Sequence, residues 1–231
     1  MKRTLALVDI DGTLILSGGA GGRAIDRAGR ELFGSEFSWE GVDPAGAMDP
    51  YLFHEAARRS GVDVGAGDED RFKECYFEFL REELVETGHL MQVLPGVHQF
   101  LARLFESASV IPALLTGNYS VSARLKLECA GIDFSKFRIG AFGDDAETRP
   151  ELVPVAQERH RALSGDEIAP EDIVIVGDTP KDVGCGKDNG CRVIAVATGS
   201  FSFEQLMETE ADLVVPHLED ERVWPFLERR G

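Results

Sequence analysis

The stretch that decides the fold is Leu5-Ala6-Leu7-Val8-Asp9-Ile10-Asp11-Gly12-Thr13. It starts with a continuous apolar run, which is typical of a strand buried on both faces of a parallel sheet. Asp9 and Asp11 follow at once, and the alternation of a strand places both side chains on the same side. A strand-to-turn junction explains Asp11-Gly12 but gives Asp9 no role. Two carboxylates so close to a buried strand are costly without a cation, so they predict a functional site.

Further short apolar runs recur along the chain, and amphipathic segments of helical length separate the later ones. This pattern predicts an α/β fold, in which a Rossmann-like parallel sheet is flanked by helices. The strands are expected at residues 5–8, 110–115, 137–142, 173–176, 193–196 and 213–215.

The long gap between the first two strands carries helical signals and no convincing strand. One helix is expected at 22–33, and a second from Asp49 as N-cap, with Pro50 at N1, to Gly61. A third is expected at 68–87, with an apolar stripe at helical spacing. We therefore expect a small helical cap domain at 16–92, inserted into a core domain of 1–15 and 93–231. The glycines of 18–22 would form one hinge; they resemble a dinucleotide-binding turn, but they do not follow the strand directly.

Polar residues follow two later strands, at the edge where ligands bind in open parallel sheets. Thr116-Gly117-Asn118 could hydrogen-bond a phosphoryl group, although Asn118 could equally be a helix N-cap. Asp178 and Asp182 offer the hard oxygen ligands that Mg²⁺ prefers. Thr179 and Asp182 also match a capping box, which would explain Asp182 but not Asp178.

Arg149 precedes a predicted helix in an otherwise acidic neighbourhood. Taken alone, it would be a solvated surface residue. It matters if the other polar clusters converge, because a phosphoryl site in this chain needs a local cation.

The composition excludes several classes of protein. A net charge of −17 repels nucleic acid and anionic membranes. The four cysteines and five histidines show no metal-ligand spacing or disulfide framework. The apolar stretch before Asp9 is too short for a secretory signal, and no other stretch is long enough to span a bilayer. We expect a cytoplasmic protein with a small-molecule partner, and the sequence predicts no oligomeric state.

Three motifs together resemble those of the haloacid dehalogenase-like (HAD) superfamily, in particular its phosphoglycolate phosphatase-like members with an α-helical cap. Asp9-Ile10-Asp11-Gly12-Thr13-Leu14 is similar to the first family motif, Thr116-Gly117-Asn118 to the second, and Gly177-Asp178-Thr179-Pro180-Lys181-Asp182 to the fourth. The resemblance implies strand order 5-4-1-2-3. Arg149 stands where the family usually has a lysine, so lysine-like geometry cannot be assumed there.

The resemblance also implies a phosphatase that hydrolyses a small phosphomonoester. Asp9 would be the nucleophile that forms an aspartyl-phosphate, and Asp11 the general acid and base. Mg²⁺ would be held by Asp9, Asp178 and the Asp11 backbone carbonyl, with Asp182 binding through water or orienting Lys181. The transferring phosphoryl group would be bound by Thr116, Gly117, Asn118 and Arg149.

Three alternatives share these residues. A phosphomutase or phosphotransferase would pass the phosphoryl group to another acceptor. A phospho-accepting signalling domain would place its aspartate on a later strand. A non-catalytic phospho-ligand-binding protein would keep the fold alone, and the Arg149 departure favours it. The segments 16–23 and 38–49 are the candidates for substrate specificity.

Overall fold

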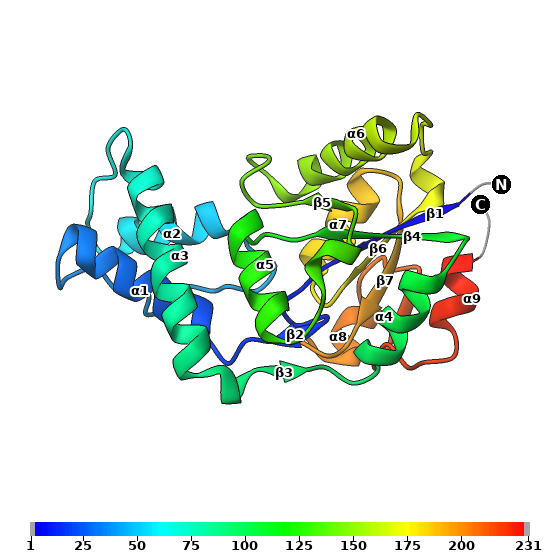
Figure 1. Cartoon of the computed structure of the whole chain (residues 1–231), viewed down its shortest axis with the longest axis horizontal. Helices are drawn as coiled ribbons and strands as arrows, with labels where there is room; N and C mark the ends of the chain where they lie inside the picture. Colours follow the sequence, from blue (N-terminus) through cyan, green and yellow to red (C-terminus); the bar gives the residue numbers. More distant parts are fainter. Residues whose placement is uncertain (1–2, 229–231) are drawn as a thin grey trace.

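The computed structural model describes residues 3–228. Its centre is a parallel sheet in the order β5-β4-β1-β6-β7-β8, which confirms the predicted α/β fold and the six predicted strands (Figure 1). When the strands of this sheet alone are counted along the chain, the first five lie in the predicted order 5-4-1-2-3, and β8 is added beside the fifth. The outermost residues of the predicted core domain, 1–2 and 229–231, lie outside the described residues. The strands are β1 (Thr4–Val8), β4 (Val110–Leu115), β5 (Ile139–Ala141), β6 (Ile173–Gly177), β7 (Arg192–Val196) and β8 (Leu213–Val215).

Strand register brings distant segments to one edge of the sheet. Val8 pairs with Leu114 on one side and with Val176 on the other. The residues that follow β1, β4 and β6 therefore lie side by side at the carboxyl ends of the central strands, which is where ligands bind in this fold.

Alternate residues of β1 face two helical layers. Ala6 and Val8 belong to one hydrophobic cluster, together with side chains of α4 (Val97–Glu106), α5 (Ser120–Cys129) and α9 (Val223–Glu228). Leu5 and Leu7 belong to another, with α6 (Leu152–Ser164) and α7 (Pro180–Asp188). Burial on both faces explains the continuous apolar runs. The remaining core helix is α8 (Phe203–Met207), and short 3₁₀ helices span Gly88–Leu90, Phe134–Lys136, Arg149–Glu151 and Pro170–Asp172.

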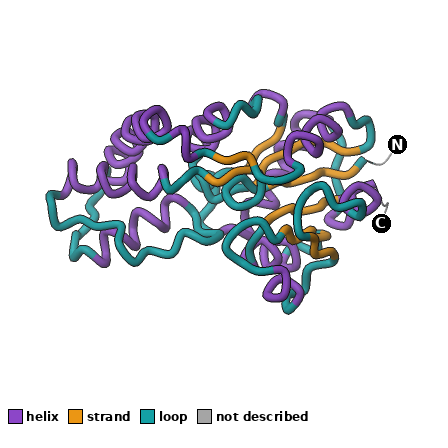
Figure 2. Tube along the Cα trace, turned by 90° about the horizontal axis from the view of Figure 1, so that it is seen from below, coloured by secondary structure: helices purple, strands orange, loops and turns teal. Residues whose placement is uncertain are grey.

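Three helices lie beyond the edge of the sheet, on the side where α3 contacts α5 (Figures 1 and 2). They are α1 (Ala20–Phe33), α2 (Asp49–Arg59) and α3 (Asp68–Glu86), close to the three predicted helices. Their own hydrophobic cluster includes Phe53, Phe72 and Tyr76, with the Phe53 and Phe72 rings stacked 4.0 Å apart. The predicted cap boundaries at 16 and 92 remain a prediction.

Two expectations for this segment are wrong. β2 (Ile15–Leu16) and β3 (Gln92–Val93) form an antiparallel pair where no strand was expected, because two-residue strands leave no periodic signal. The N-cap of α2 is Met48, so Asp49 is the first helical residue. The Asp49 side chain is used elsewhere: its Oδ2 accepts from the Tyr119 amide at 2.9 Å and the Ser122 hydroxyl at 2.7 Å. No described helix is long and apolar enough to cross a membrane.

Candidate active site

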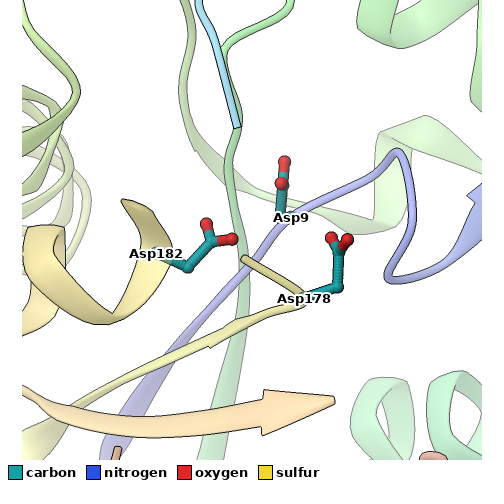
Figure 3. Close-up of side chains that lie close together, drawn as sticks. All are labelled: Asp9, Asp178 and Asp182. Atoms are coloured by element: carbon teal, nitrogen blue, oxygen red, sulfur yellow. The ribbon is translucent and has the colours of Figure 1, made fainter. Parts of the chain in front are cut away.

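Three carboxylates meet at the carboxyl edge of the sheet. Asp9 follows β1, Asp178 follows β6, and Asp182 lies in the first turn of α7. Each is buried, and each offers an oxygen within 4.8 Å of the others. Figure 3 shows the side chains of all three gathered around one space.

The acidic cluster is electrostatically expensive. Burial raises the pKa of Asp9 to about 6; Arg149 opposes this shift, and Asp182 adds to it. Burial also raises the pKa of Asp178 to about 8, with further increases from Asp182 and Asp9. The Asp178 carboxylate accepts a hydrogen bond from Thr13 at 3.0 Å. Buried carboxylates that repel one another in this way fit a divalent cation with oxygen ligands such as Mg²⁺.

Glycines leave room around Asp178. A Cβ atom at Gly12 or Gly199 would collide with the Asp178 carboxylate. Gly12 also has φ +82°, a left-handed conformation that side chains rarely adopt. Glycine at position 12 is therefore required both by the turn and by the close approach of Asp178.

Asp182 has two roles in the structure. Its Oδ2 accepts from the Thr179 amide at 3.0 Å and the Thr179 hydroxyl at 2.7 Å, which confirms the capping box. Its Oδ1 accepts from Arg149 at 2.6 Å. The capping explanation is therefore confirmed, and the same carboxylate also lies in the acidic cluster, where its role as a metal ligand stays a prediction.

Arg149 is buried in the site, so the interpretation as a solvated surface residue is wrong. Its Nη2 lies 2.9 Å from Asp9 Oδ2 and 2.6 Å from Asp182 Oδ1, and all three side chains are less than 10 % exposed. Burial lowers the pKa of Arg149, but Asp182 and Asp9 outweigh it and hold the guanidinium charged. Its Nε is buried and has no hydrogen-bond partner among residues 3–228.

The Asp11 carboxylate is not part of the acidic cluster and has its own hydrogen-bond partners. Its Oδ2 accepts from Lys126 at 2.7 Å and from Asn118 at 2.9 Å, and its Oδ1 accepts from Ser17 at 3.2 Å. Desolvation raises the pKa of Asp11, but Lys126 and these hydrogen bonds outweigh it, so the net shift is downward. Metal binding through the Asp11 backbone carbonyl stays a prediction, and the Asp11 carboxylate is not part of the acidic group.

The residues that follow β4 connect the acidic cluster with Asp11 and its partners. Asn118 is not an N-cap, because Tyr119 has that position in α5. The Asn118 amide instead donates to Thr116 Oγ1 at 2.8 Å and to Asp11, while its oxygen accepts from Lys126 at 2.5 Å. Gly117 lies against the backbone of Ala47, which leaves no space for a Cβ.

The sequence did not single out Lys126. It lies two turns into α5, 5 % exposed, and its ammonium meets Asp11 in the site. The sequence offers no usable signal for it, because the burial of Lys126 and of Ser122 on α5 depends on segments that are distant in the chain.

A cavity of about 430 Å³ lies over these residues, between the sheet edge and the α1–α3 helices. Its floor includes Asp9, Asp11, Thr116, Arg149 and Asp178. Its other wall comes from the start of α1 and the loop before α2. The chain thus provides a concave site for a small molecule, with Asp9 and Asp178 at its base.

Comparisons with known proteins agree with this fold. A sequence model of the HAD-hydrolase-like family matches residues 149–221. The structure of CbbY from Rhodobacter sphaeroides in complex with phosphate is similar at TM-score 0.76 and 18% identity, covering 98% of this chain and 100% of that one. A hydrolase from Pseudomonas syringae gives TM-score 0.66 and 19% identity, covering 94% and 95%.

A protein from Haemophilus somnus 129PT, described as a predicted phosphoglycolate phosphatase, gives TM-score 0.65 and 19% identity, covering 95% of this chain and 96% of that one. Comparison with curated protein sequences gives no match. The resemblance of this chain to the HAD-like hydrolases is therefore confirmed in the fold of the whole chain and, at the level of sequence, in residues 149–221.

Proposed function

We propose that the protein is a magnesium-dependent phosphatase that hydrolyses a small phosphomonoester through an aspartyl-phosphate on Asp9. The observation that carries the proposal is the position of Asp9. It lies at the base of the cavity, 2.9 Å from a buried arginine and within the acidic cluster. The phosphate bound to CbbY, a neighbour of the same fold, supports a phosphate ester as substrate.

In the first step, an oxygen of Asp9 forms a bond to phosphorus while the bond from phosphorus to the leaving oxygen breaks. Because Arg149 lies on Asp9 Oδ2, we assign the attack to Oδ1. Asp11, which Lys126 holds as a carboxylate in the free protein, takes up a proton when the negatively charged ester binds beside it, and then gives that proton to the leaving oxygen. Thr116 and Arg149 contact the transferring oxygens, with Gly117 and Asn118 completing the phosphoryl pocket.

In the second step, water attacks phosphorus and the bond to Asp9 breaks, which releases phosphate. Asp11 takes the proton from that water. The Lys126 contact suits this step, because it holds Asp11 as a carboxylate and fixes its position. Asp9 and Asp178 would hold Mg²⁺ directly. Asp182 would bind the ion through water or orient Lys181. When bound, the ion supplies positive charge that offsets repulsion between the nucleophile and the phosphoryl group.

The helices α1–α3 would act as the cap, with residues 16–92 as the mobile unit that excludes water from the closed site. The cytoplasmic location remains a prediction.

The test is phosphate release from p-nitrophenyl phosphate and a panel of small phosphomonoesters, with magnesium and with a chelator. We expect release that needs the metal and is lost in Asp9→Asn. Asp188→Asn is the matched control, because Asp188 is exposed on α7 and its side chain makes no hydrogen bond to a described residue. Release that persists in Asp9→Asn would refute the proposal. Release that appears only when an acceptor alcohol is added would point to a phosphotransferase.

A further inference from the structure

Asp49 is a buried carboxylate that the steps above do not use. It is the first residue of α2, it is 6 % exposed, and it borders the cavity. Burial raises the pKa of Asp49, while Lys126 and the hydrogen bonds that Asp49 accepts oppose this shift. A buried carboxylate is costly unless its partners compensate for the lost water. Those partners therefore indicate what the carboxylate does.

Both the side chain and the amide of Asp49 bind the segment that follows β4 and starts α5. Oδ2 accepts from the Tyr119 amide at 2.9 Å and from the Ser122 hydroxyl at 2.7 Å. The Asp49 amide donates to the Gly117 carbonyl at 2.7 Å. Tyr119 is the N-cap of α5, and Ser122 stands at N3, where a capping box has a carboxylate that accepts from the N-cap amide. Asp49 supplies that carboxylate from a different helix.

Close backbone packing keeps the same segment in place. A Cβ atom on Gly117 would collide with the Ala47 carbonyl, and a Cβ atom on Gly143 would collide with the Gly117 carbonyl. The Gly143 amide also donates to the Asn118 carbonyl at 2.7 Å. Residues 117 and 118 are therefore held between the loop before α2 on one side and the loop after β5 on the other.

The side chain that this segment carries into the site is that of Asn118. Its amide donates to Thr116 Oγ1 at 2.8 Å and to Asp11 Oδ2 at 2.9 Å. Its oxygen accepts from Lys126 at 2.5 Å. A shift of the backbone at residues 117–119 would therefore disturb the phosphoryl pocket and the proposed general acid and base together.

From these contacts we infer that Asp49 is a positioning residue, which fixes residues 117–119 from the side of α2 and so holds Asn118 in the phosphoryl pocket. The inference rests on the proposed phosphatase function and adds to it a residue from the α1–α3 helices. Asp49 acts through the backbone of α5 and of the preceding loop, not on the transferring group. The phosphoryl pocket thus depends on the contact between the start of α2 and the start of α5.

Binding of inorganic phosphate tests the inference without any chemical step. We would measure its Kd by calorimetry in the presence of magnesium. In Asp49→Ala we expect the Kd to rise about tenfold or more, since a hydrogen bond to a charged group typically has this value. Asp49→Asn should restore the Kd to within about threefold, because an amide oxygen in the place of Oδ2 accepts both hydrogen bonds.

Two esters distinguish positioning from contact with the leaving group. We would compare kcat/KM for p-nitrophenyl phosphate and 2-hydroxyethyl phosphate, which share the phosphoryl group and differ in the leaving group. Asp49→Ala should lower both values by the same factor. A decrease for one ester alone would show that Asp49 contacts the leaving group, and would overturn the inference.

Asp68→Ala is the matched control. Asp68 is the first residue of α3, and its carboxylate accepts from the Gly65 amide at 2.9 Å and from Arg71 at 3.1 Å, both within the α1–α3 segment. This variant should leave the Kd for phosphate unchanged. If Asp49→Ala does not fold, Ser122→Ala replaces it; it removes one donor to Asp49 and should raise the Kd by about threefold or more.

The outcomes separate the two proposals. An unchanged Kd in Asp49→Ala, or an equal rise in Asp49→Asn or in Asp68→Ala, would overturn the positioning role, while hydrolysis of p-nitrophenyl phosphate by the unaltered protein upholds the phosphatase. If the unaltered protein binds phosphate but hydrolyses no ester, the phosphatase proposal falls, and the Kd values still decide the role of Asp49. Failure to bind phosphate and to hydrolyse any ester would overturn both.

Discussion

Replacing Arg149 with methionine removes the one cation that contacts both Asp9 and Asp182 in the described structure. The long apolar side chain of methionine keeps most of the packing of the arginine stem. It leaves two carboxylates, each less than 10 % exposed, without their ion-pair partner. Breaking a buried ion pair in this way typically costs about 3–5 kcal/mol. The protein escapes part of this cost by protonating a carboxyl, at about 1.4 kcal/mol per pH unit above its ordinary pKa.

We therefore expect Arg149→Met to lower the free energy of unfolding by about 3–5 kcal/mol at pH 7 in a chelator. For a chain of this size, Tm should fall by about 6–20 °C. A carboxyl whose pKa is raised in the folded state loses stability as pH rises from its unfolded pKa toward its folded pKa. The loss relative to the unaltered protein should thus be larger at pH 8 than at pH 5. Urea denaturation at the two pH values measures both effects.

Arg159→Met is the matched control on α6. Arg159 is 42% exposed and pairs with Asp145 at the surface, where an ion pair contributes about 0–1 kcal/mol. If Arg149→Met costs no more than Arg159→Met, the interpretation of Arg149 as the buried counter-ion of the site is wrong.

Three further predictions follow from the same geometry. Asp11→Asn should slow turnover by roughly 100-fold or more and leave folding intact, because it removes the general acid and base; steady-state kinetics and circular dichroism check this, and near-normal turnover would contradict it. Magnesium at about 100 times its Kd should stabilise the unaltered protein by about 2.7 kcal/mol, which raises Tm by about 5–10 °C, and the Asp178→Asn variant should lose this increase. If thermal unfolding shows the same increase in Tm for both proteins, Asp178 does not hold the metal. Lys126→Met should raise the apparent pKa that Asp11 gives to the pH dependence of the rate by about one pH unit or more, because Lys126 lowers the pKa of Asp11. An unchanged pH–rate profile would show that the contact does not act in solution.

The strands of the sheet could be predicted because burial on both faces leaves a continuous apolar run. Val8 lies between Leu114 and Val176, and each belongs to such a run. The antiparallel pair β2 and β3 could not be predicted, because each strand has two residues and pairing there depends on the distant partner segment.

The acidic part of the site could also be predicted, since Asp9 and Asp178 directly follow buried strands. The place of Arg149 in the site was harder to predict, because its neighbours in the sequence are mostly acidic. Its partners in the structure, Asp9 and Asp182, are far away in the chain. Lys126 gave no usable signal. A lysine inside a helix is usually solvated, and its burial here depends on α3 lying over α5.

The central claim is that Asp9 becomes covalently phosphorylated. The most direct test is to quench the enzyme during turnover of the best phosphomonoester, reduce acyl phosphates with borohydride, and map the modified residue by mass spectrometry. We predict conversion of residue 9 to homoserine in the unaltered protein, and none in Asp9→Asn or without substrate. Full phosphatase activity with no modification at residue 9, or with modification at another aspartate, would contradict the account.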